Sequence, residues 1–278
     1  MGNMLVNTEW VAQQGRASHV RLLEVDVDTS AYDHGHVQGA FGVNWTSQLC
    51  DSVRRDVLTP TQFKQLCSQL GITANTTVVF YGDNNNWFAA YALWQFRYHG
   101  HAKDKLKLMD GGRTKWILEG RRLVTEVPTT EPSIYVPAEP THAIRCFKDE
   151  VFAHLDHGTL NLVDVRSPAE YRGEVIAPPG MKESALRGGH IPGAINIPWT
   201  ETVNEDGTFK SWDELLDLFT RAGLDPNRKT VVYCRIGERS AHTWFALAGL
   251  LGLDDVCNYD GSWTEWGNLI SAPIERAD

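Results

Sequence analysis

One cysteine in the carboxyl-terminal half of the chain has neighbours that suit reactive sulfur chemistry. Residues 234–239 read Cys-Arg-Ile-Gly-Glu-Arg and follow the short apolar run 230–233. Loop N–H groups, the positive end of a following helix and the cations of Arg235 and Arg239 all stabilise negative charge. Such surroundings lower the pKa of a thiol from about 8.5 to between about 3.5 and 7.5. We therefore predict that Cys234 is a nucleophilic thiolate at neutral pH.

The remaining cysteines lack this context. Gly237 suits a loop that turns sharply after the nucleophile, whereas no glycine and arginine pair follows the other four cysteines, Cys50, Cys67, Cys146 and Cys257. The sequence contains no C-x-x-C pair and no Cys/His cluster at zinc-ligand spacing. We expect these four to be structural, with no disulfide framework and no metal site. The alternative for Cys234 is a buried core thiol at a strand end.

The elements around Cys234 predict where it lies in the fold. Residues 160–165 and 230–233 have the composition of buried strands, and residues 212–222 and 240–251 have helical spacing. Alternating strands and helices predict an α/β domain with a mostly parallel sheet. Ligands of such sheets bind beyond the carboxyl ends of the strands, which is where Cys234 is placed.

The chain also contains an internal repeat. Residues 39–45 match 193–199 at an offset of 154, residues 77–81 match 230–234 at 153, and residues 110–116 match 260–266 at 150. Offsets that drift so little indicate a duplicated domain. Four prolines between the halves predict an extended surface linker. We predict domains at 1–124 and 144–278, joined by a linker at 125–143.

Composition excludes several classes of function. The 278 residues carry a net charge of −9 with no Lys/Arg block, which disfavours nucleic acid and anionic lipid as partners. No stretch approaches the roughly 18 apolar residues of a membrane span, and the amino terminus has no basic, apolar leader pattern. We expect a soluble, cytoplasmic protein whose thiol is kept reduced.

Four ordered motifs carry a family resemblance. Residues 233–240, together with 162–166, 189–194 and 259–263, resemble the tandem-domain rhodanese family, specifically the bacterial thiosulfate sulfurtransferases. The resemblance implies two tandem rhodanese-like domains, each a mostly parallel sheet flanked by helices. It also implies that only the carboxyl-terminal domain is catalytic, with the site in a cleft between the domains. The repeat places Tyr81 opposite Cys234, so the loop at 82–87 is expected to serve structure and to form a wall of that cleft.

The same resemblance implies a mechanism without a cofactor. Cys234 attacks the outer sulfur of thiosulfate, sulfite leaves, and a persulfide remains until an acceptor removes the sulfur. Cyanide, glutathione, a thioredoxin-like protein and a sulfur-carrier protein remain open as acceptors. The donor-binding residues are expected in the loop itself, namely Arg235, Ile236, Gly237, Glu238, Arg239 and Ser240.

The identity of the donor rests on the charged residues. A cation directly after the cysteine is typical of family members that use thiosulfate, so Arg235 favours that donor over 3-mercaptopyruvate, the alternative. Ile236 and Glu170 stand where the animal thiosulfate enzymes have cations. Arg172 or Arg187 could replace a missing cation, and the alternative for each is a solvated surface charge.

Two further residues have competing interpretations. Asp164 is a candidate to orient Arg235 or Arg239, and the alternative is a capping carboxylate. His190 is expected to fix a turn by hydrogen bonding and not to act as a base, because a preformed thiolate needs none.

Two rival functions follow from the same loop. Cysteine-dependent phosphatases wrap a phosphate with Cys-x5-Arg, whereas Cys234 and Arg239 form Cys-x4-Arg, a ring sized for a persulfide. A non-enzymatic sulfur-binding module is the second rival, and the retained cysteine and arginines argue against it.

Overall fold

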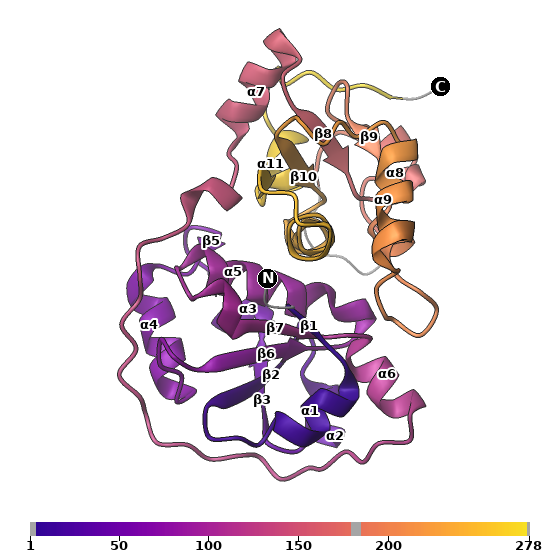
Figure 1. Ribbon diagram of the computed structural model, residues 1–278. Helices are drawn as coiled ribbons and strands as arrows, with labels where there is room; N and C mark the ends of the chain where they lie inside the picture. The colour runs from indigo at the N-terminus through magenta and orange to yellow at the C-terminus, as the bar shows by residue number, and fades with distance from the viewer. Residues whose placement is uncertain (1–3, 179–184, 277–278) are drawn as a thin grey trace. The chain divides into compact units, whose positions relative to one another are not determined.

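The computed structural model describes residues 4–178 and 185–276, which form two compact units (Figure 1). Unit 1 consists of Met1–Thr141 with Glu205–Phe209, and unit 2 of His142–Asn204 with Lys210–Asp278. Each unit has its own parallel sheet. Within the described residues, no helix has the length and apolar character needed to cross a membrane.

Unit 1 is built on a five-stranded parallel sheet in the order β1-β7-β6-β2-β3. The apolar run of β6 is buried along its whole length, as expected for a strand covered on both faces. A short antiparallel hairpin of β4 and β5 stands apart from this sheet. The strands are β1 (Leu5–Val6), β2 (Val20–Asp26), β3 (Ala40–Asn44), β4 (Cys50–Asp51), β5 (Asp56–Val57), β6 (Thr77–Tyr81) and β7 (Leu106–Met109).

The helices of unit 1 cover both faces of its sheet, with α1 and α6 on one side and α5 on the other (Figure 1). α5 is apolar around most of its circumference and packs on the central strands, which explains its burial. α4 begins with a capping box between Thr59 and Gln62. The helices are α1 (Thr8–Gln14), α2 (Ser30–His34), α3 (Trp45–Gln48), α4 (Pro60–Gln69), η1 (Asn84–Asn86), α5 (Trp87–Tyr98), η2 (Lys103–Lys105) and α6 (Gly112–Leu118).

Unit 2 repeats this plan with a four-stranded parallel sheet in the order β11-β10-β8-β9. The predicted strands and helices appear within a few residues of their expected bounds, and the expected α/β fold of two parallel sheets is confirmed. The elements are η3 (His142–Ile144), α7 (Lys148–His157), β8 (Asn161–Asp164), α8 (Pro168–Arg172), β9 (Ile195–Asn196), η4 (Trp199–Thr202), α9 (Trp212–Arg221), β10 (Thr230–Tyr233), α10 (Glu238–Trp244), the π-helical η5 (Phe245–Leu251), β11 (Val256–Asn258) and α11 (Ser262–Trp266).

The segment 125–141 has neither helix nor strand and follows unit 1 as an extended chain (Figure 1). It is anchored there by hydrogen bonds, from Ser133 N–H to Ser68 O (2.9 Å) and from Thr141 N–H to Tyr98 O (2.7 Å). Tyr135 is buried in the same unit. The proline-rich stretch is therefore tied to the surface of unit 1 by specific contacts.

Matching hydrogen bonds define how the two sheets correspond. The Tyr81 hydroxyl accepts the Val37 N–H (3.0 Å), and the Tyr233 hydroxyl accepts the Ile191 N–H (3.1 Å). In addition, the Arg113 N–H donates to Gly82 O and the Trp263 N–H to Cys234 O, each at 3.1 Å.

These pairs show that Tyr81 corresponds to Tyr233 and that Gly82 corresponds to Cys234. The equivalence of Tyr81 with Cys234 expected from the repeat is therefore wrong by one residue. Both sequences read as a β-branched run followed by an aromatic residue, so the pattern alone does not fix the register. The conclusion that unit 1 has no cysteine at this position still holds.

Candidate active site

Cys234 lies at the carboxyl end of β10, in a loop of residues 234–237 that leads into α10. Gly237 ends this loop with φ at +98°, a conformation that favours glycine. A Cβ atom at this position would lie 2.7 Å from Cβ of Asp260. The turn after the cysteine therefore requires glycine both for its backbone conformation and for space.

Three groups surround the sulfur of Cys234. The Gly237 N–H donates to Sγ at 3.1 Å, and the Ser240 hydroxyl oxygen lies 3.5 Å from Sγ. The thiol donates to Glu238 Oε2 at 3.4 Å. The sulfur thus lies beside the Gly237 N–H, which stabilises negative charge, and beside a carboxylate that can accept its proton.

A second set of hydrogen bonds holds the loop in place. The Cys234 N–H donates to Ser262 Oγ at 3.1 Å. Asn258 joins the two ends of the loop, because its side chain accepts from Ser240 Oγ (2.6 Å) and donates to Gly237 O (2.9 Å). The strand β11 and the turn that follows it therefore fix the backbone around the sulfur.

Arg239 is held by Glu170 in a bidentate ion pair, with both N–O distances at 3.0 Å. The side chains of Arg239 and Glu170 are 5% and 1% exposed. Burial raises the pKa of Glu170, but the hydrogen bonds and charge of Arg239, together with the Ser167 N–H and the charge of Arg166, hold this pKa below its ordinary value. Glu170, which also closes a capping box with Ser167, fixes the direction of the arginine.

Among the described ion pairs, Asp164 is not the partner of Arg235 or of Arg239. It forms a fully buried pair with Arg166 at 2.6 Å, and that guanidinium lies 4.3 Å from the Trp263 ring centroid. The candidate role for Asp164 is therefore corrected, because the acid that orients Arg239 is Glu170.

The charge state of Cys234 differs from the sequence-based expectation. Burial raises the pKa of the thiol, and the Glu238 carboxylate raises it further, while Arg239 and Ser240 lower it. The side chain is 0% exposed, and a sulfur anion without solvent is costly. The expectation of a lowered thiol pKa is wrong in this state of the protein, because the sequence shows the arginines but not the burial or the position of Glu238.

The other predicted loop residues are buried in unit 2 beside Cys234. Arg235 is 1% exposed and Ile236 is 6% exposed. The carbonyl of Arg235 accepts the Thr264 N–H at 3.0 Å. The structure thus brings together Cys234 and all six residues from 235 to 240.

Arg172 and Arg187, the two additional candidate cations, make their described contacts with groups other than Cys234. Arg172 is half-exposed and pairs with Glu174 at 2.6 Å. Arg187 donates to four backbone carbonyls at and after the end of α11, those of Trp266, Gly267, Leu269 and Ala272. Arg187 therefore satisfies the free carbonyls of a helix end, and Arg172 fits the alternative of a surface charge.

His190 has the structural role that was expected. Its Nδ1 atom lies 2.8 Å from Tyr171 O, and its ring stacks on the Tyr171 ring with centroids 3.6 Å apart. The backbone of His190 pairs with Glu275 in an isolated bridge. Each of these contacts fixes the chain path before β9.

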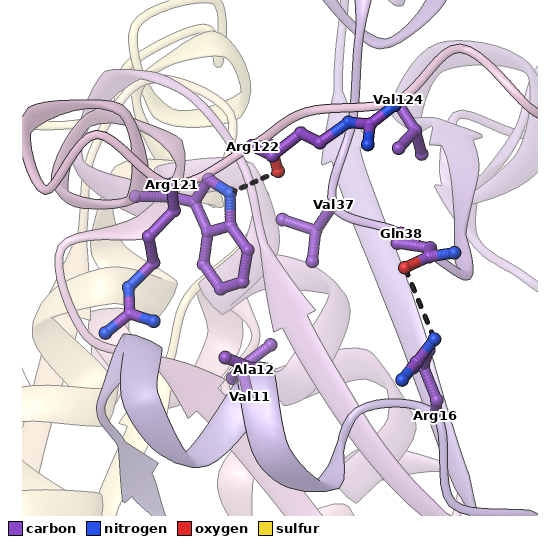
Figure 2. Close-up of a pocket in the computed structure, with 9 residues that line it drawn as sticks. Val11, Ala12, Arg16, Val37, Gln38, Arg121, Arg122 and Val124 are labelled. Carbon is purple, nitrogen blue, oxygen red and sulfur yellow. Dashed lines mark hydrogen bonds between the residues drawn. The ribbon is translucent and has the colours of Figure 1, made fainter.

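A pocket of about 360 Å³ lies in unit 1 and contains none of the predicted site residues (Figure 2). Trp116 forms part of its wall and donates to Arg122 O at 3.1 Å, while Arg16 contacts Gln38 at 3.4 Å. The cation of Arg121 is already paired with Glu9 and Glu119. The lining residues are Val11, Ala12, Arg16, Val37, Gln38, Trp116, Arg121, Arg122 and Val124.

Comparisons with known proteins identify the family of the chain. Residues 7–119 and 147–269 each match the rhodanese-like domain. A Haloferax volcanii protein with the provisional name thiosulfate sulfurtransferase is 52% identical over 281 residues, covering 99% of this chain and 97% of that protein. The sulfur carrier protein TtuD of Thermus thermophilus is 51% identical over 279 residues, covering 99% and 97%.

A solved structure shares the fold of the chain. EanB, determined with a persulfide on a cysteine and with ergothioneine, matches with a TM-score of 0.87 at 27% identity, covering 99% of this chain and 71% of EanB. The chain therefore belongs to the rhodanese family and contains two rhodanese-like domains in tandem.

Proposed function

We propose that the protein is a sulfurtransferase that moves the outer sulfur of thiosulfate through a Cys234 persulfide to cyanide or a thiol. The observation that carries this proposal is the position of Sγ, 3.1 Å from the Gly237 N–H and beside the buried pair of Arg239 and Glu170. The provisional name of the Haloferax relative and the persulfide in EanB support the same chemistry.

The reaction begins with removal of the thiol proton. Glu238, whose carboxylate oxygen lies 3.4 Å from Sγ, is placed to accept it. The thiolate then attacks the outer sulfur of thiosulfate, the S–S bond of the donor breaks, and its electron pair leaves with sulfite. Arg239 and the Gly237 N–H stabilise the anionic persulfide. The acceptor attacks the outer sulfur of the persulfide, and Cys234 is regenerated as the thiolate.

Donor access requires movement around the loop, because Cys234 has no exposed surface. A dianionic donor is repelled by the thiolate unless a cation compensates its charge. Arg235, directly after the nucleophile, is the proposed contact, and 3-mercaptopyruvate remains the alternative donor.

Transfer of sulfur from thiosulfate to cyanide tests the proposal. We expect thiocyanate to form with the native protein and not with Cys234→Ser, and we expect ping-pong kinetics. Cys67→Ser, which removes a buried cysteine of unit 1, is the matched control and should retain activity. Thiocyanate production by Cys234→Ser at the native rate would refute the mechanism.

Sulfur carriage to another protein is the second candidate function, favoured by the name of the Thermus relative. It uses the same persulfide but a protein acceptor, for example a thioredoxin-like or sulfur-carrier protein. A stable persulfide that cyanide and small thiols remove only slowly would favour carriage over transfer. A phosphatase would form no persulfide, and a non-enzymatic sulfur-binding module would not turn over thiosulfate.

The proposed persulfide cycle sets the redox state, location and cofactor requirement that we expect. The proposed cycle needs a reduced Cys234, and all five cysteines are free thiols in the structure, so we propose a reducing, cytoplasmic location. The cycle uses no metal and no organic cofactor, since the loop N–H group, Arg239 and Glu238 supply the charge stabilisation and the proton acceptor.

A further inference from the structure

Two further cysteines and a glutamate converge in unit 2, apart from the residues that contact Cys234. Cys146 lies two residues before α7, Glu150 lies in the first turn of α7, and Cys257 lies in β11. The two Sγ atoms and a carboxylate oxygen of Glu150 all lie within 4.8 Å of one another. Three atoms of metal-ligand type thus converge although two of the residues are 111 positions apart in the sequence.

The pairing of the backbone explains this convergence. Arg145 pairs with Asn258 in an isolated parallel bridge, and the Cys146 N–H donates to Asn258 O at 3.0 Å. Cys146 follows Arg145 and Cys257 precedes Asn258. Because side chains alternate along extended chains, both cysteines project from the face opposite to that of Arg145 and Asn258, and they are diagonal to each other. The thiols therefore face each other across the gap between β11 and the start of α7.

Diagonal placement favours a bridging ion over a disulfide. Diagonal neighbours in a sheet lie farther apart than directly opposite residues, whereas a disulfide needs Cα atoms closer than about 7 Å. Two sulfurs held a few ångströms apart fit the ligand spacing of a tetrahedral ion, in which each sulfur lies about 2.3 Å from the metal. A metal ion can therefore link the two cysteine sulfurs without movement of the backbone.

The charges around the two cysteines and the exposure of Glu150 also suit a bound cation. Lys229 forms an ion pair with Glu150, and its positive charge interacts with both cysteines as well. Two thiolates and one carboxylate carry three negative charges, which a divalent cation and the Lys229 ammonium neutralise together. Both cysteines are fully buried, while the Glu150 side chain is 39% exposed and provides an entry route from solvent.

We propose that Cys146, Cys257 and Glu150 bind a thiophilic divalent cation of the Zn²⁺ class, with water as the fourth ligand. Binding converts two thiols to thiolates and releases two protons, so affinity rises with pH. Sulfur ligands select Zn²⁺ or Cd²⁺ over Mg²⁺ and Ca²⁺, which prefer oxygen. This site is independent of the proposed sulfur transfer, since none of its residues contacts Cys234 in the hydrogen bonds described for that thiol.

Titration with Cd²⁺ tests the proposal, because cadmium bound to thiolates produces sulfur-to-metal charge-transfer absorption in the ultraviolet. The experiment uses the full chain with Cys234→Ser, which removes the reactive thiol. We expect saturation at one Cd²⁺ per chain, loss of the absorption in the added variants Cys146→Ser and Cys257→Ser, and a Cd²⁺ affinity about 10-fold to 100-fold weaker with Glu150→Gln. Cys67→Ser is the matched control and should leave the absorption unchanged.

The result that overturns the proposal is equally direct. No charge-transfer absorption, or an absorption that persists when Cys146 and Cys257 are both replaced, contradicts it. If the cysteine variants fail to fold, as judged by circular dichroism, Glu150→Gln decides: an unchanged Cd²⁺ affinity contradicts the site. Zn²⁺ should also raise the Tm of Cys234→Ser, with a rise that grows with the logarithm of the Zn²⁺ concentration above its Kd, and no rise at saturating Zn²⁺ contradicts binding to the folded chain.

Discussion

The loops after β6 and β10 occupy equivalent places in the two sheets, yet their backbone N–H groups have different hydrogen-bond acceptors. After β10, the Gly237 N–H points at the sulfur of Cys234 (3.1 Å). After β6, the Gly82 N–H donates to Asn86 Oδ1 (2.9 Å) and the Asp83 N–H to Asp26 Oδ1 (3.1 Å). In the loop after β6 the side chains of Asn86 and Asp26 therefore accept these N–H groups, whereas in the loop after β10 the Gly237 N–H is directed to a nucleophile.

The acids around the two loops reinforce this difference. In unit 1, burial, followed by the charge of Asp83, raises the pKa of Asp26 to about 8. In unit 2, burial also raises the pKa of Glu170, but the hydrogen bonds and charge of Arg239, the Ser167 N–H and the charge of Arg166 together lower it. The same fold thus forms a self-contained loop in one unit and an anion-stabilising loop in the other, so the fold alone does not confer the chemistry.

The largest expected effect comes from moving the thiol between the loops. In a chain with Cys234→Ser and Gly82→Cys, we expect thiocyanate formation to stay at background. A Cβ at Gly82 would lie 2.5 Å from Val25 O, and the neighbouring N–H donors are already occupied. The measurement is the thiosulfate to cyanide assay, with circular dichroism to confirm folding. Restored activity in a folded variant would show that the loops are equivalent.

Removing one partner of the buried pair beside Cys234 has the next largest effect. Glu170→Gln leaves the buried guanidinium of Arg239 without its carboxylate, which costs about 3–5 kcal/mol in the free energy of unfolding. The control is Glu174→Gln, an exposed acid paired with Arg172, for which we expect less than about 1 kcal/mol. Urea denaturation measures both, and equal effects would contradict the assigned role of Glu170.

The smallest effect concerns the pH dependence of the thiol. The Glu238 carboxylate contributes, after burial, to the raised pKa of Cys234, so Glu238→Gln should move the midpoint of thiol ionisation to lower pH. Burial remains, and the pKa should therefore stay above that of an ordinary cysteine. The rate of alkylation by iodoacetamide against pH, read by intact mass, measures this midpoint. A midpoint that moves to higher pH in Glu238→Gln would contradict the electrostatic role of the carboxylate.

The elements and the nucleophile could be predicted from the sequence because their signals are local. The apolar run of β10, the glycine of the turn and the capping box of α9, formed by Ser211 and Glu214, each act within a few residues. These signals place Cys234 at a strand end without knowledge of the rest of the fold. They also placed the repeat correctly to within one residue.

Long-range contacts and burial could not be predicted in this way. Glu170 and Arg239 are 69 residues apart, and no local pattern distinguishes Glu170 from Asp164 as the orienting acid. The sign of the Cys234 pKa shift depends on burial, which the neighbouring arginines do not reveal. The approach of Cys146 to Cys257 depends on the pairing of a loop with β11, which has no local signal.

Intact mass spectrometry after incubation with thiosulfate reports whether Cys234 accepts a sulfur atom. We expect the native protein to gain one sulfur, about 32 Da, and to lose this mass on addition of cyanide, and we expect Cys234→Ser to gain none. An unchanged native mass, or an added sulfur that persists in Cys234→Ser, would contradict sulfur transfer through this cysteine.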